Sequence, residues 1–499
     1  MKKMKNRSAL YFALIFAVLT GMFPVSSFAA GYTNDSYSYN YDYWGEEIPT
    51  PDSYYVKNIF AGIDLGIGNF KEPQGIFIRD NRIYICDTGN SRVVLIEYDG
   101  TNNKYNLIKT VGSVMINGEE SVIKSPYDLF ETQGGEIFIA DTDNQRILRL
   151  DKDFNYINSI NKPTDTSFSE NTEFLPCKLV VDPSNRLFAQ VRNVNKGFVE
   201  FTVDGEFIGY IGASRVNPSL ADIFWKAIAT DAQRARMELF VPTEYNNLCL
   251  DYDGFLYATL STFKGDIEKA DPVRRLNAVG SDILVRNGYG APIGDWNWWN
   301  KGGVSGPSKF CDVVAFKNNS YACLDRSRGR IFTYDFQGNI LYIFGGIGNK
   351  DGRFLDAVGM DEMGYDIFVL DSRACSVTHF SLTEYGTHIN EAMNYYYNGL
   401  YEKSAEEWDN VLKFNGSYDL AYIGKGRSAL LRGDYKEAME LFEIKNDEKN
   451  YGKSFQLYRK QWIEERIVPI IFILIGLYVI VKGLRLVIRI RGGKGGEKE

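Results

Sequence analysis

A seventeen-residue segment of the chain occurs twice. Residues 83–99 read IYICDTGNSRVVLIEYD and residues 137–153 read IFIADTDNQRILRLDKD, so that Asp141 lies 54 residues after Asp87. In each copy two apolar runs rich in strand-forming residues flank the turn residues Asp-Thr-x-Asn, which predicts a β-hairpin. An Arg five residues after the Asp can extend back to the turn carboxylate. A repeat of this kind indicates a chain built from copies of one β unit.

Weaker copies of the hairpin follow further along the chain. Asp325 is followed by Arg330 at the same five-residue interval, and Asp371 opens a copy in which Ser376 replaces the Arg. Two more copies, at residues 187–203 and 255–276, are degenerate. A strand candidate precedes each hairpin, and most hairpins are followed by a strand that ends in glycine. Six units of about four strands predict a six-bladed β-propeller.

The ring is also expected to close. The sixth unit passes into a helical pattern at about Leu382 and lacks a fourth strand of its own, whereas residues 55–62 form an orphan fourth strand before the first unit. We expect this segment to complete blade six, because joining the two ends of the propeller removes an exposed sheet edge. In the hairpin turns, the third residue, Gly89 or Asp143, tolerates positive φ.

The hairpin, with its Asp-Thr-x-Asn-x-Arg turn, resembles NHL repeats, in two clear and four weak copies over about residues 54–385. The resemblance implies the propeller fold and leaves the activity open. Propellers of similar shape include lactonases of the gluconolactonase type, a zinc-dependent amidating lyase, RNA-binding propellers and protein-binding platforms, and the fold does not choose among them.

Both ends of the chain carry targeting signals. Basic residues precede the apolar run 9–23 and small residues follow it, which predicts a secretory signal peptide; a retained N-terminal anchor is the alternative. Residues 467–481 are uninterruptedly apolar, and the basic residues after them place the C-terminal tail in the cytoplasm by the positive-inside rule. The bulk of the chain is then expected outside a cell membrane, as a single-pass protein. The competing interpretation of residues 467–481 is a buried core helix.

A helical segment precedes this span. Residues 398–408 (NGLYEKSAEEW) are echoed 34 residues later by residues 432–442 (RGDYKEAMELF), which resembles tetratricopeptide repeats over about residues 386–462. Such helix pairs present concave surfaces to peptides, and the alternative is a rigid stalk.

The composition limits the chemistry available. The pI near 5.2 argues against a nucleic-acid partner, and the six scattered cysteines form no CxxC pair and are expected to be buried free thiols. His379 and His388 are the two histidines, too few for a multi-histidine zinc site. The repeated aspartates at 87, 141, 325 and 371 are either turn caps, which we favour, or cation ligands around the axis. We therefore expect no catalytic residues, no metal and no cofactor.

Long insertions interrupt the repeats at residues 213–246, 261–271 and 286–309, and alternation of strand direction places all three on one face, around blade four. The last insertion contains the run DWNWWN. Its tryptophans offer platforms for sugars or anchors for a protein, and the alternative is a satellite core that packs the insertions down. The candidate ligand-binding residues are Trp296, Trp298, Trp299 and Trp225.

The sequence thus predicts a mainly β protein that presents a propeller to a protein or glycan partner at the cell surface. An extracellular metal-dependent hydrolase of the gluconolactonase-like type is the alternative, and the absence of a convergent catalytic set favours a non-enzyme. The expected domains are a signal peptide (1–29), a Tyr-rich arm (30–53), the propeller (54–385), a tetratricopeptide-like helical domain (386–465), a transmembrane helix (466–490) and a cytoplasmic tail (491–499). The arm is expected to be either mobile or weakly wrapped onto the propeller rim.

Overall fold

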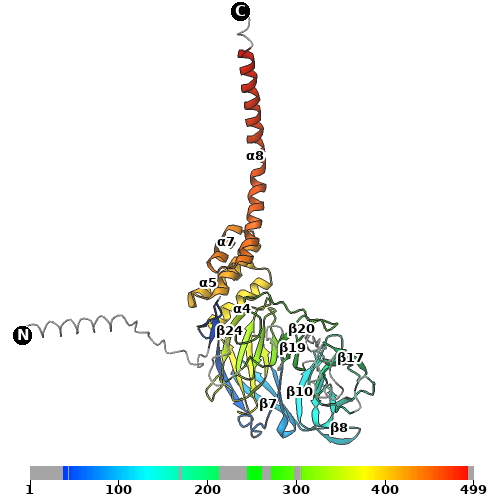
Figure 1. The fold of residues 1–499 in the computed structure, drawn as a ribbon. Helices are drawn as coiled ribbons and strands as arrows, with labels where there is room; N and C mark the ends of the chain where they lie inside the picture. Colours follow the sequence, from blue (N-terminus) through cyan, green and yellow to red (C-terminus); the bar gives the residue numbers. More distant parts are fainter. Residues whose placement is uncertain are drawn as a thin grey trace, which may run out of the picture. The chain divides into compact units, whose positions relative to one another are not determined.

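The computed structural model describes residues 38–492, apart from residues 43, 167, 169–170, 213–243, 261–270, 297–303 and 305. The chain divides into two units, Met1–Thr383 and Glu384–Glu499. The first is a six-bladed β-propeller and the second consists of five helices (Figure 1). The signal-peptide prediction falls outside the described residues.

Each blade is an antiparallel sheet, and in all blades but the sixth the strands follow one another in the chain. Blade one contains β4 (Gly75–Arg79), β5 (Arg82–Asp87), β6 (Arg92–Asp99) and β7 (Lys104–Val111), and blade two contains β10 (Pro126–Glu131), β11 (Ile137–Asp141), β12 (Arg146–Leu150) and β13 (Tyr156–Asn161). Blade three contains β14 (Pro176–Val181), β15 (Arg186–Val191), β16 (Phe198–Thr202) and β17 (Phe207–Ile211), and blade four contains β18 (Tyr245–Leu250), β19 (Leu256–Leu260) and β20 (Val273–Leu276). Blade five contains β21 (Phe310–Ala315), β22 (Tyr321–Asp325), β23 (Arg330–Tyr334) and β24 (Ile340–Gly345), and blade six contains β25 (Ala357–Met363), β26 (Asp366–Asp371), β27 (Ser376–Leu382) and β3 (Tyr54–Ala61). A small hairpin, β8 (Ser113–Ile116) and β9 (Glu119–Val122), connects blades one and two.

The ring closes as the sequence predicts. The first strands contact one another in the cycle β4, β10, β14, β18, β21, β25 and back to β4. β3 pairs with β27 along its whole length, from Ala61 opposite Ser376 to Tyr54 opposite Leu382. β3 therefore completes blade six, so that the ring has no free sheet edge where its two ends meet.

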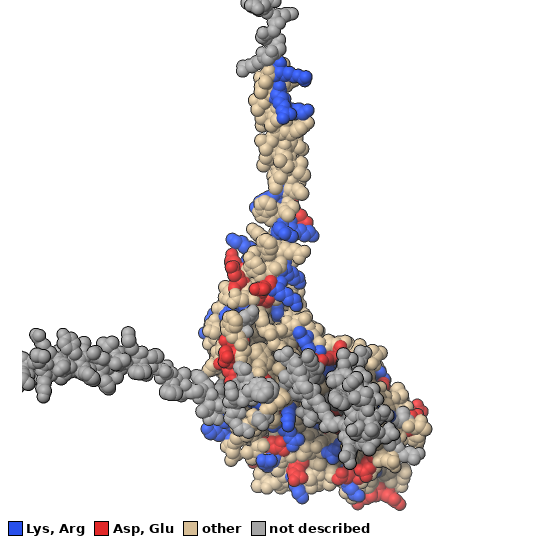
Figure 2. All heavy atoms as spheres, in the orientation of Figure 1, with Lys and Arg blue, Asp and Glu red and all other residues tan. Residues whose placement is uncertain are grey.

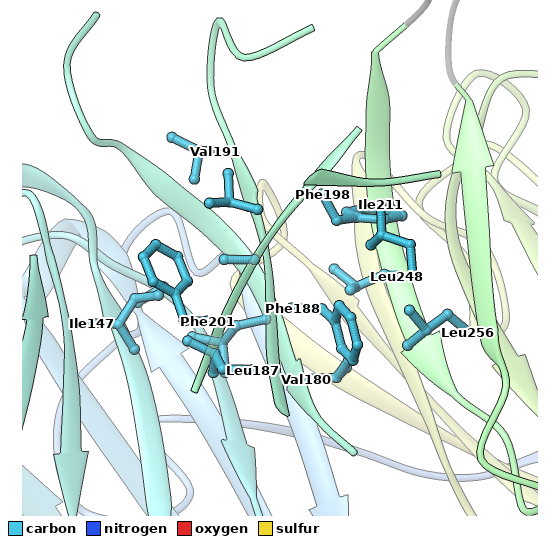
Figure 3. Packing of buried hydrophobic residues seen from close by; sticks show 14 of the residues in the cluster. Ile147, Val180, Leu187, Phe188, Val191, Phe198, Phe201, Ile211, Leu248 and Leu256 are labelled. Carbon is cyan, nitrogen blue, oxygen red and sulfur yellow. The ribbon is translucent and has the colours of Figure 1, made fainter. Parts of the chain in front are cut away.

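Large apolar side chains fill the spaces between the blades. Figure 3 shows one such cluster, in which Ile147 of β12, Phe188 and Phe201 of blade three and Leu248 of β18 lie between successive sheets. Phe198 and Phe201 have no exposed surface, because both faces of a blade are covered by its neighbours.

The repeated aspartates cap the hairpin turns. Asp87 accepts hydrogen bonds from the Lys71 amide (2.7 Å), Asn90 Nδ2 (2.9 Å) and Arg92 Nε (2.6 Å). Asp141 accepts the same three kinds of bond from the equivalent residues of blade two. Each carboxylate thereby fastens the second-to-third-strand turn to the segment that precedes the blade's first strand.

The positive φ in these turns falls two positions after the residue that the sequence marks as tolerant of it. Ser91 (φ 53°) and Gln145 (φ 56°), which directly precede the third strand, are left-handed. Gly89 serves a different purpose, since a Cβ there would lie 2.7 Å from the Lys71 carbonyl oxygen. The absence of a side chain at Gly89 therefore allows the backbone of Lys71 to approach the turn.

Substituting Asp141 tests the capping role. We expect Asp141→Ala to lower the free energy of unfolding by about 1–3 kcal/mol, because the side chain is fully buried and its donors would lose their acceptor. Denaturant unfolding measures the loss. Asp153→Ala, at a position 68% exposed, is the matched control and should change stability by less than about 0.5 kcal/mol. Equal effects of the two substitutions would contradict the capping role.

The described part of residues 38–53 packs on the propeller, which is the second of the two alternatives for the Tyr-rich arm. β1 (Tyr39–Tyr41) and β2 (Glu47–Pro49) form a hairpin, and β1 adds to the outer strand of blade five, where Tyr39 lies opposite Ile343. Low aliphatic content does not prevent this packing, because tyrosines supply the buried surface: Tyr39 is 2% exposed.

The helical unit contains α4 (Glu384–Tyr397), α5 (Tyr401–Phe414), α6 (Asp419–Arg432), α7 (Tyr435–Ile444) and α8 (Glu448–Gly492). α5 and α7 begin 34 residues apart, in agreement with the period in the sequence. α6 packs closely on both of its neighbours through glycines: a Cβ at Gly424 would lie 2.2 Å from Trp408 of α5, and one at Gly426 would lie 2.7 Å from Phe442 of α7.

α8 is long and apolar enough to cross a membrane. Its most apolar window has a mean hydropathy of 2.6, and none of that window is buried by the described chain. In Figure 2 the upper part of α8 is almost free of charge up to a group of Lys and Arg side chains near its end. Two cation–π contacts lie along this helix: the Arg466 guanidinium is 4.9 Å from the Trp462 ring, and Lys482 Nζ is 5.6 Å from the Tyr478 ring.

Candidate ligand-binding cavity in the propeller channel

A cavity of about 850 Å³ occupies the channel of the propeller. It is lined by the first strands of the blades and by the turns that join first and second strands, among them Asp80, Gln133, Asn185, Tyr252, Lys317 and Gly364. Since strand direction alternates, these turns lie at the opposite end of the propeller from the capped turns described above. The volume is within the usual range for small-molecule sites, about 300–1,000 Å³.

Polar side chains recur at one position in the first strands. The third residue of β10, β14, β18, β21 and β25 follows a β-bulge in each strand and is Asp128, Lys178, Asn247, Asp312 and Gly359, respectively. The side chains of Asp128, Lys178, Asn247 and Asp312 are all buried, and all four line the cavity.

Lys178 is the positively charged member of this group of four buried side chains. Its Nζ lies 3.4 Å from Asp128 Oδ1, and it is only 7% exposed. Burial by itself lowers the pKa of Lys178, but the carboxylates of Asp128 and Asp312 outweigh this and hold the pKa above its ordinary value. The ammonium group therefore stays charged and partly neutralises two buried carboxylates.

The aspartates of the channel also join neighbouring blades. Asp128 Oδ2 accepts the Leu179 amide of blade three at 3.0 Å, and Asp312 Oδ2 accepts the Met360 amide of blade six at 2.7 Å. Asp361 Oδ2 accepts the Ile78 amide of blade one at 2.6 Å. Each carboxylate thus satisfies a backbone donor of the next inner strand, which would otherwise be unpaired in the channel wall.

The titration of Asp312 predicts a pH dependence of stability. Burial raises its pKa to about 6 although Lys178 opposes the shift, so the native state holds a proton that the unfolded chain has already released. This contribution to stability is complete below about pH 4 and is lost as the pH rises through about 6.

We therefore expect wild-type stability to fall relative to that of Asp312→Asn between pH 4 and pH 7, by roughly 2–3 kcal/mol. Urea unfolding of both proteins at several pH values measures the difference. A difference that grows in favour of the wild type as the pH rises would contradict the assignment.

A second group of polar residues lies on the cavity wall nearer its mouth. Glu362 Oε1 accepts a hydrogen bond from the Tyr252 hydroxyl, and Glu362 is half-buried. Burial raises the pKa of Glu362, against the lowering effects of Tyr252, Lys317 and Arg79. Arg79 Nη2 donates to the Glu131 carbonyl oxygen at 2.6 Å, and the guanidinium lies 5.4 Å from the Phe77 ring.

The structure places one of the four predicted ligand-binding tryptophans. Trp296 stacks on Tyr41 of the N-terminal hairpin (centroids 4.5 Å apart), and its Nε1 donates to the Ala291 carbonyl oxygen at 3.3 Å. Its contacts are those of a packed side chain. Trp298, Trp299 and Trp225 lie outside the described residues, so their binding role stays a prediction.

Asp295, the residue before Trp296, changes the ion pair expected in blade five. Arg330 does not bond Asp325 as Arg92 bonds Asp87; its Nη1 donates to Asp295 Oδ2 at 3.1 Å. Arg328 takes the place of the expected arginine, with contacts to both Asp325 (3.4 Å) and Asp295 (3.0 Å). The insertion brings in Asp295, which has no exposed surface and contacts both arginines.

The two histidines have separate environments. His379 is fully buried in blade six, where its ring nitrogens contact Tyr105 and Asp366. His388 Nδ1 of α4 lies 2.6 Å from Glu407 Oε2 of α5, and with Glu391 these residues are the one group in the described part of the chain whose His, Cys, Asp or Glu ligand atoms converge within 4.8 Å. All six cysteines are free, as expected, but only Cys86, Cys177 and Cys323 are fully buried.

No family model matches the chain, and no curated protein matches it. Among solved structures, it is similar to a virginiamycin B lyase from Staphylococcus aureus, at 12% identity over 66% of this chain and 100% of that chain, with a TM-score of 0.38. It is also similar to a Bacteroides thetaiotaomicron protein of unknown function (12% identity, 63% of this chain and 70% of that chain, TM-score 0.41). A third similar structure is the extracellular domain of the hybrid two-component system BT4673 from B. thetaiotaomicron. Its identity is 13% over 62% of this chain and 33% of that chain, with a TM-score of 0.34.

These similarities are fold-level and assign no activity. The arrangement of blades and helices defines the class: a six-bladed β-propeller followed by a helical unit whose last helix is able to span a membrane.

Proposed function

We propose that the protein is a membrane-anchored, extracellular binding protein that holds a protein or glycan partner at the mouth of its propeller channel. The observation that carries the proposal is the charge arrangement in the channel, where the ammonium group of Lys178 lies against Asp128. The propeller is, on this view, an NHL-like platform, and the helices are tetratricopeptide-like.

The same observation weighs against the hydrolase alternative. A metal-dependent hydrolase needs a cation with an open coordination position at the reacting centre. In this channel the chain supplies its own cation, and oxygens of Asp128, Asp312 and Asp361 already accept backbone amides. Among the described residues, these three carboxylates do not form a convergent ligand group.

Site-specific photo-cross-linking tests the binding role. A photoreactive phenylalanine analogue replaces Tyr252, a cavity residue that is 53% exposed, or Met115, which is 58% exposed and lies on the separate β8–β9 hairpin. In cells that make the full-length protein, we expect a discrete adduct from position 252 that position 115 does not give, and we expect Glu362→Gln to weaken it. Identical patterns from both positions would refute binding at the channel mouth.

The proposed topology makes a separate prediction. The basic residues after residue 481 place the tail inside, so a tag at residue 30, after signal-peptide cleavage, should be digested by protease added to intact cells, whereas a C-terminal tag should be protected. Immunoblotting both tags before and after permeabilisation provides the measurement. Protection of both tags would contradict the outside location of the propeller.

A further inference from the structure

The first two helices of the helical unit, α4 and α5, bring one histidine and two glutamates together. His388 and Glu391 are three residues apart on α4 and therefore share one face of that helix, and Glu407 meets them from α5. One ligand atom from each residue lies within 4.8 Å of the other two. With bonds of about 2.0–2.2 Å, the ligand atoms of one tetrahedral zinc ion are about 3.3–3.6 Å apart, so small side-chain rotations would bring all three to one ion.

The group carries negative charge that its surroundings do not balance. The side chains of His388 and Glu407 are only 20% and 18% exposed, and a mostly buried carboxylate usually pairs with a cation. No lysine or arginine in the described part of the chain forms an ion pair with Glu391 or Glu407, and His388 is charged only when protonated. Two carboxylates beside a neutral imidazole match the charge of a divalent cation.

The His388 ring is oriented as in a metal-binding histidine. Its Nδ1 lies 2.6 Å from Glu407 Oε2, whereas its Nε2, on the other side of the ring, lies 3.9 Å from Glu384 Oε1. A histidine that binds a metal through one nitrogen normally donates the other N–H to a carboxylate. Glu384 is 76% exposed and free to close this gap, so it is placed to accept the Nε2–H while Nδ1 binds a cation.

Packing fixes the two helices around the group. Ile389 and Ala392 of α4 and Trp408 and Val411 of α5 are at most 2% exposed. Ser404 Oγ of α5 also donates to the Ala392 carbonyl oxygen of α4 at 2.9 Å. The backbone positions of the three ligands are therefore set before a cation arrives, and only their side chains need to adjust.

The helical repeat does not require these three residues. At the equivalent positions 34 residues later, the chain has Tyr422, Lys425 and Leu441. The second pair of helices, α6 and α7, packs without the histidine and the two glutamates. Helix packing therefore does not account for the group.

We propose that His388, Glu391 and Glu407 bind a divalent transition-metal cation of the zinc type. The imidazole nitrogen favours such a cation over Ca²⁺ and Mg²⁺, which prefer sites made of oxygen ligands alone. Three protein ligands leave one position of a tetrahedral ion for water. The bound ion clamps α4 to α5, and because the site lies within the helical unit it does not depend on the binding role of the propeller.

Isothermal titration calorimetry of the full-length protein in detergent, stripped with a chelator and exchanged into chelator-free buffer, tests the proposal. The probes are ZnCl₂, CaCl₂ and MgCl₂. We expect Zn²⁺ to bind, and Ca²⁺ and Mg²⁺ to give no binding heat. Glu407→Gln preserves the shape and an acceptor for His388 but removes the charge, and it should weaken zinc binding by about 10-fold or more. Glu391→Gln should do the same.

Glu406→Gln, at the exposed neighbouring position of α5, is the matched control and should leave zinc binding unchanged. Co²⁺, which absorbs visible light in tetrahedral zinc sites, provides a second readout, and its absorption band should appear in the wild type and the control but not in Glu407→Gln. Zinc affinity that is the same in both Gln variants and the wild type would overturn the site. Absence of zinc binding to the wild type would overturn it as well and leave an ordinary His388–Glu407 pair. Preferential binding of Ca²⁺ or Mg²⁺ that is lost in Glu407→Gln would overturn the cation class.

Discussion

Replacing Lys178 with methionine is expected to lower the free energy of unfolding by about 3–5 kcal/mol. Methionine fills a similar volume, so the loss comes from charge: the carboxylates of Asp128 and Asp312 would remain buried without their cation. The native state would then take up a proton, and the variant should regain stability at low pH. Denaturant unfolding at neutral and acidic pH measures both effects.

The double variant Lys178→Met with Asp128→Asn separates charge from packing. Because it removes both members of the 3.4 Å pair, we expect it to be more stable than Lys178→Met alone. Lys152→Met, at a position 74% exposed, is the surface control and should stay within about 0.5 kcal/mol of the wild type. A Lys178→Met protein as stable as this control would show that the cation is unimportant to the channel.

Asp295→Ala is expected to cost a comparable amount, about 3–5 kcal/mol. Asp295 has no exposed surface and contacts Arg328 at 3.0 Å, Arg330 at 3.1 Å and the Tyr41 hydroxyl at 2.8 Å. Its loss removes the carboxylate that the two buried guanidinium groups share.

The substitution should also loosen the N-terminal hairpin. Tyr41 of this hairpin donates to Asp295, stacks on Trp296 and accepts the Trp296 amide. Limited proteolysis that cuts within residues 38–53 of the variant faster than of the wild type would report this effect. Asp253→Ala, whose side chain is 42% exposed, serves as the control. Unchanged stability and unchanged proteolysis in Asp295→Ala would contradict the structural role of the cluster.

The fold was predictable because its determinants are local and repeated. The turn of residues 87–92 brings donor and acceptor within five residues of each other, and the copy at residues 141–146 repeats it with the same bonds. The closing strand β3 was predictable for the same reason, since its pattern matches a fourth strand that blade six lacks.

The candidate site was not predicted, because its residues come together only in the closed ring. Lys178 and Asp128 are 50 residues apart, and Asp312 is further still. A usable signal was present in the sequence: charged residues occupy the same place in otherwise apolar first strands, as in Lys178-Leu-Val-Val and Asp312-Val-Val-Ala. The ion pair of Arg330 with Asp295 was not predicted, because Asp295 lies in an insertion outside the repeat.

Lys178 supplies the positive charge beside Asp128 inside the channel, and on this basis we propose that the propeller binds its partner at the channel mouth without a metal. The most direct test is the unfolding transition of the full-length protein with CaCl₂ in large excess. We predict an unchanged transition for the wild type and for His388→Ala, which removes the separate ligand group in the helical unit. A calcium-dependent rise of the propeller's transition by the several degrees that tight binding confers, kept in His388→Ala and abolished in Asp312→Asn, would contradict the account and favour the metal-dependent hydrolase.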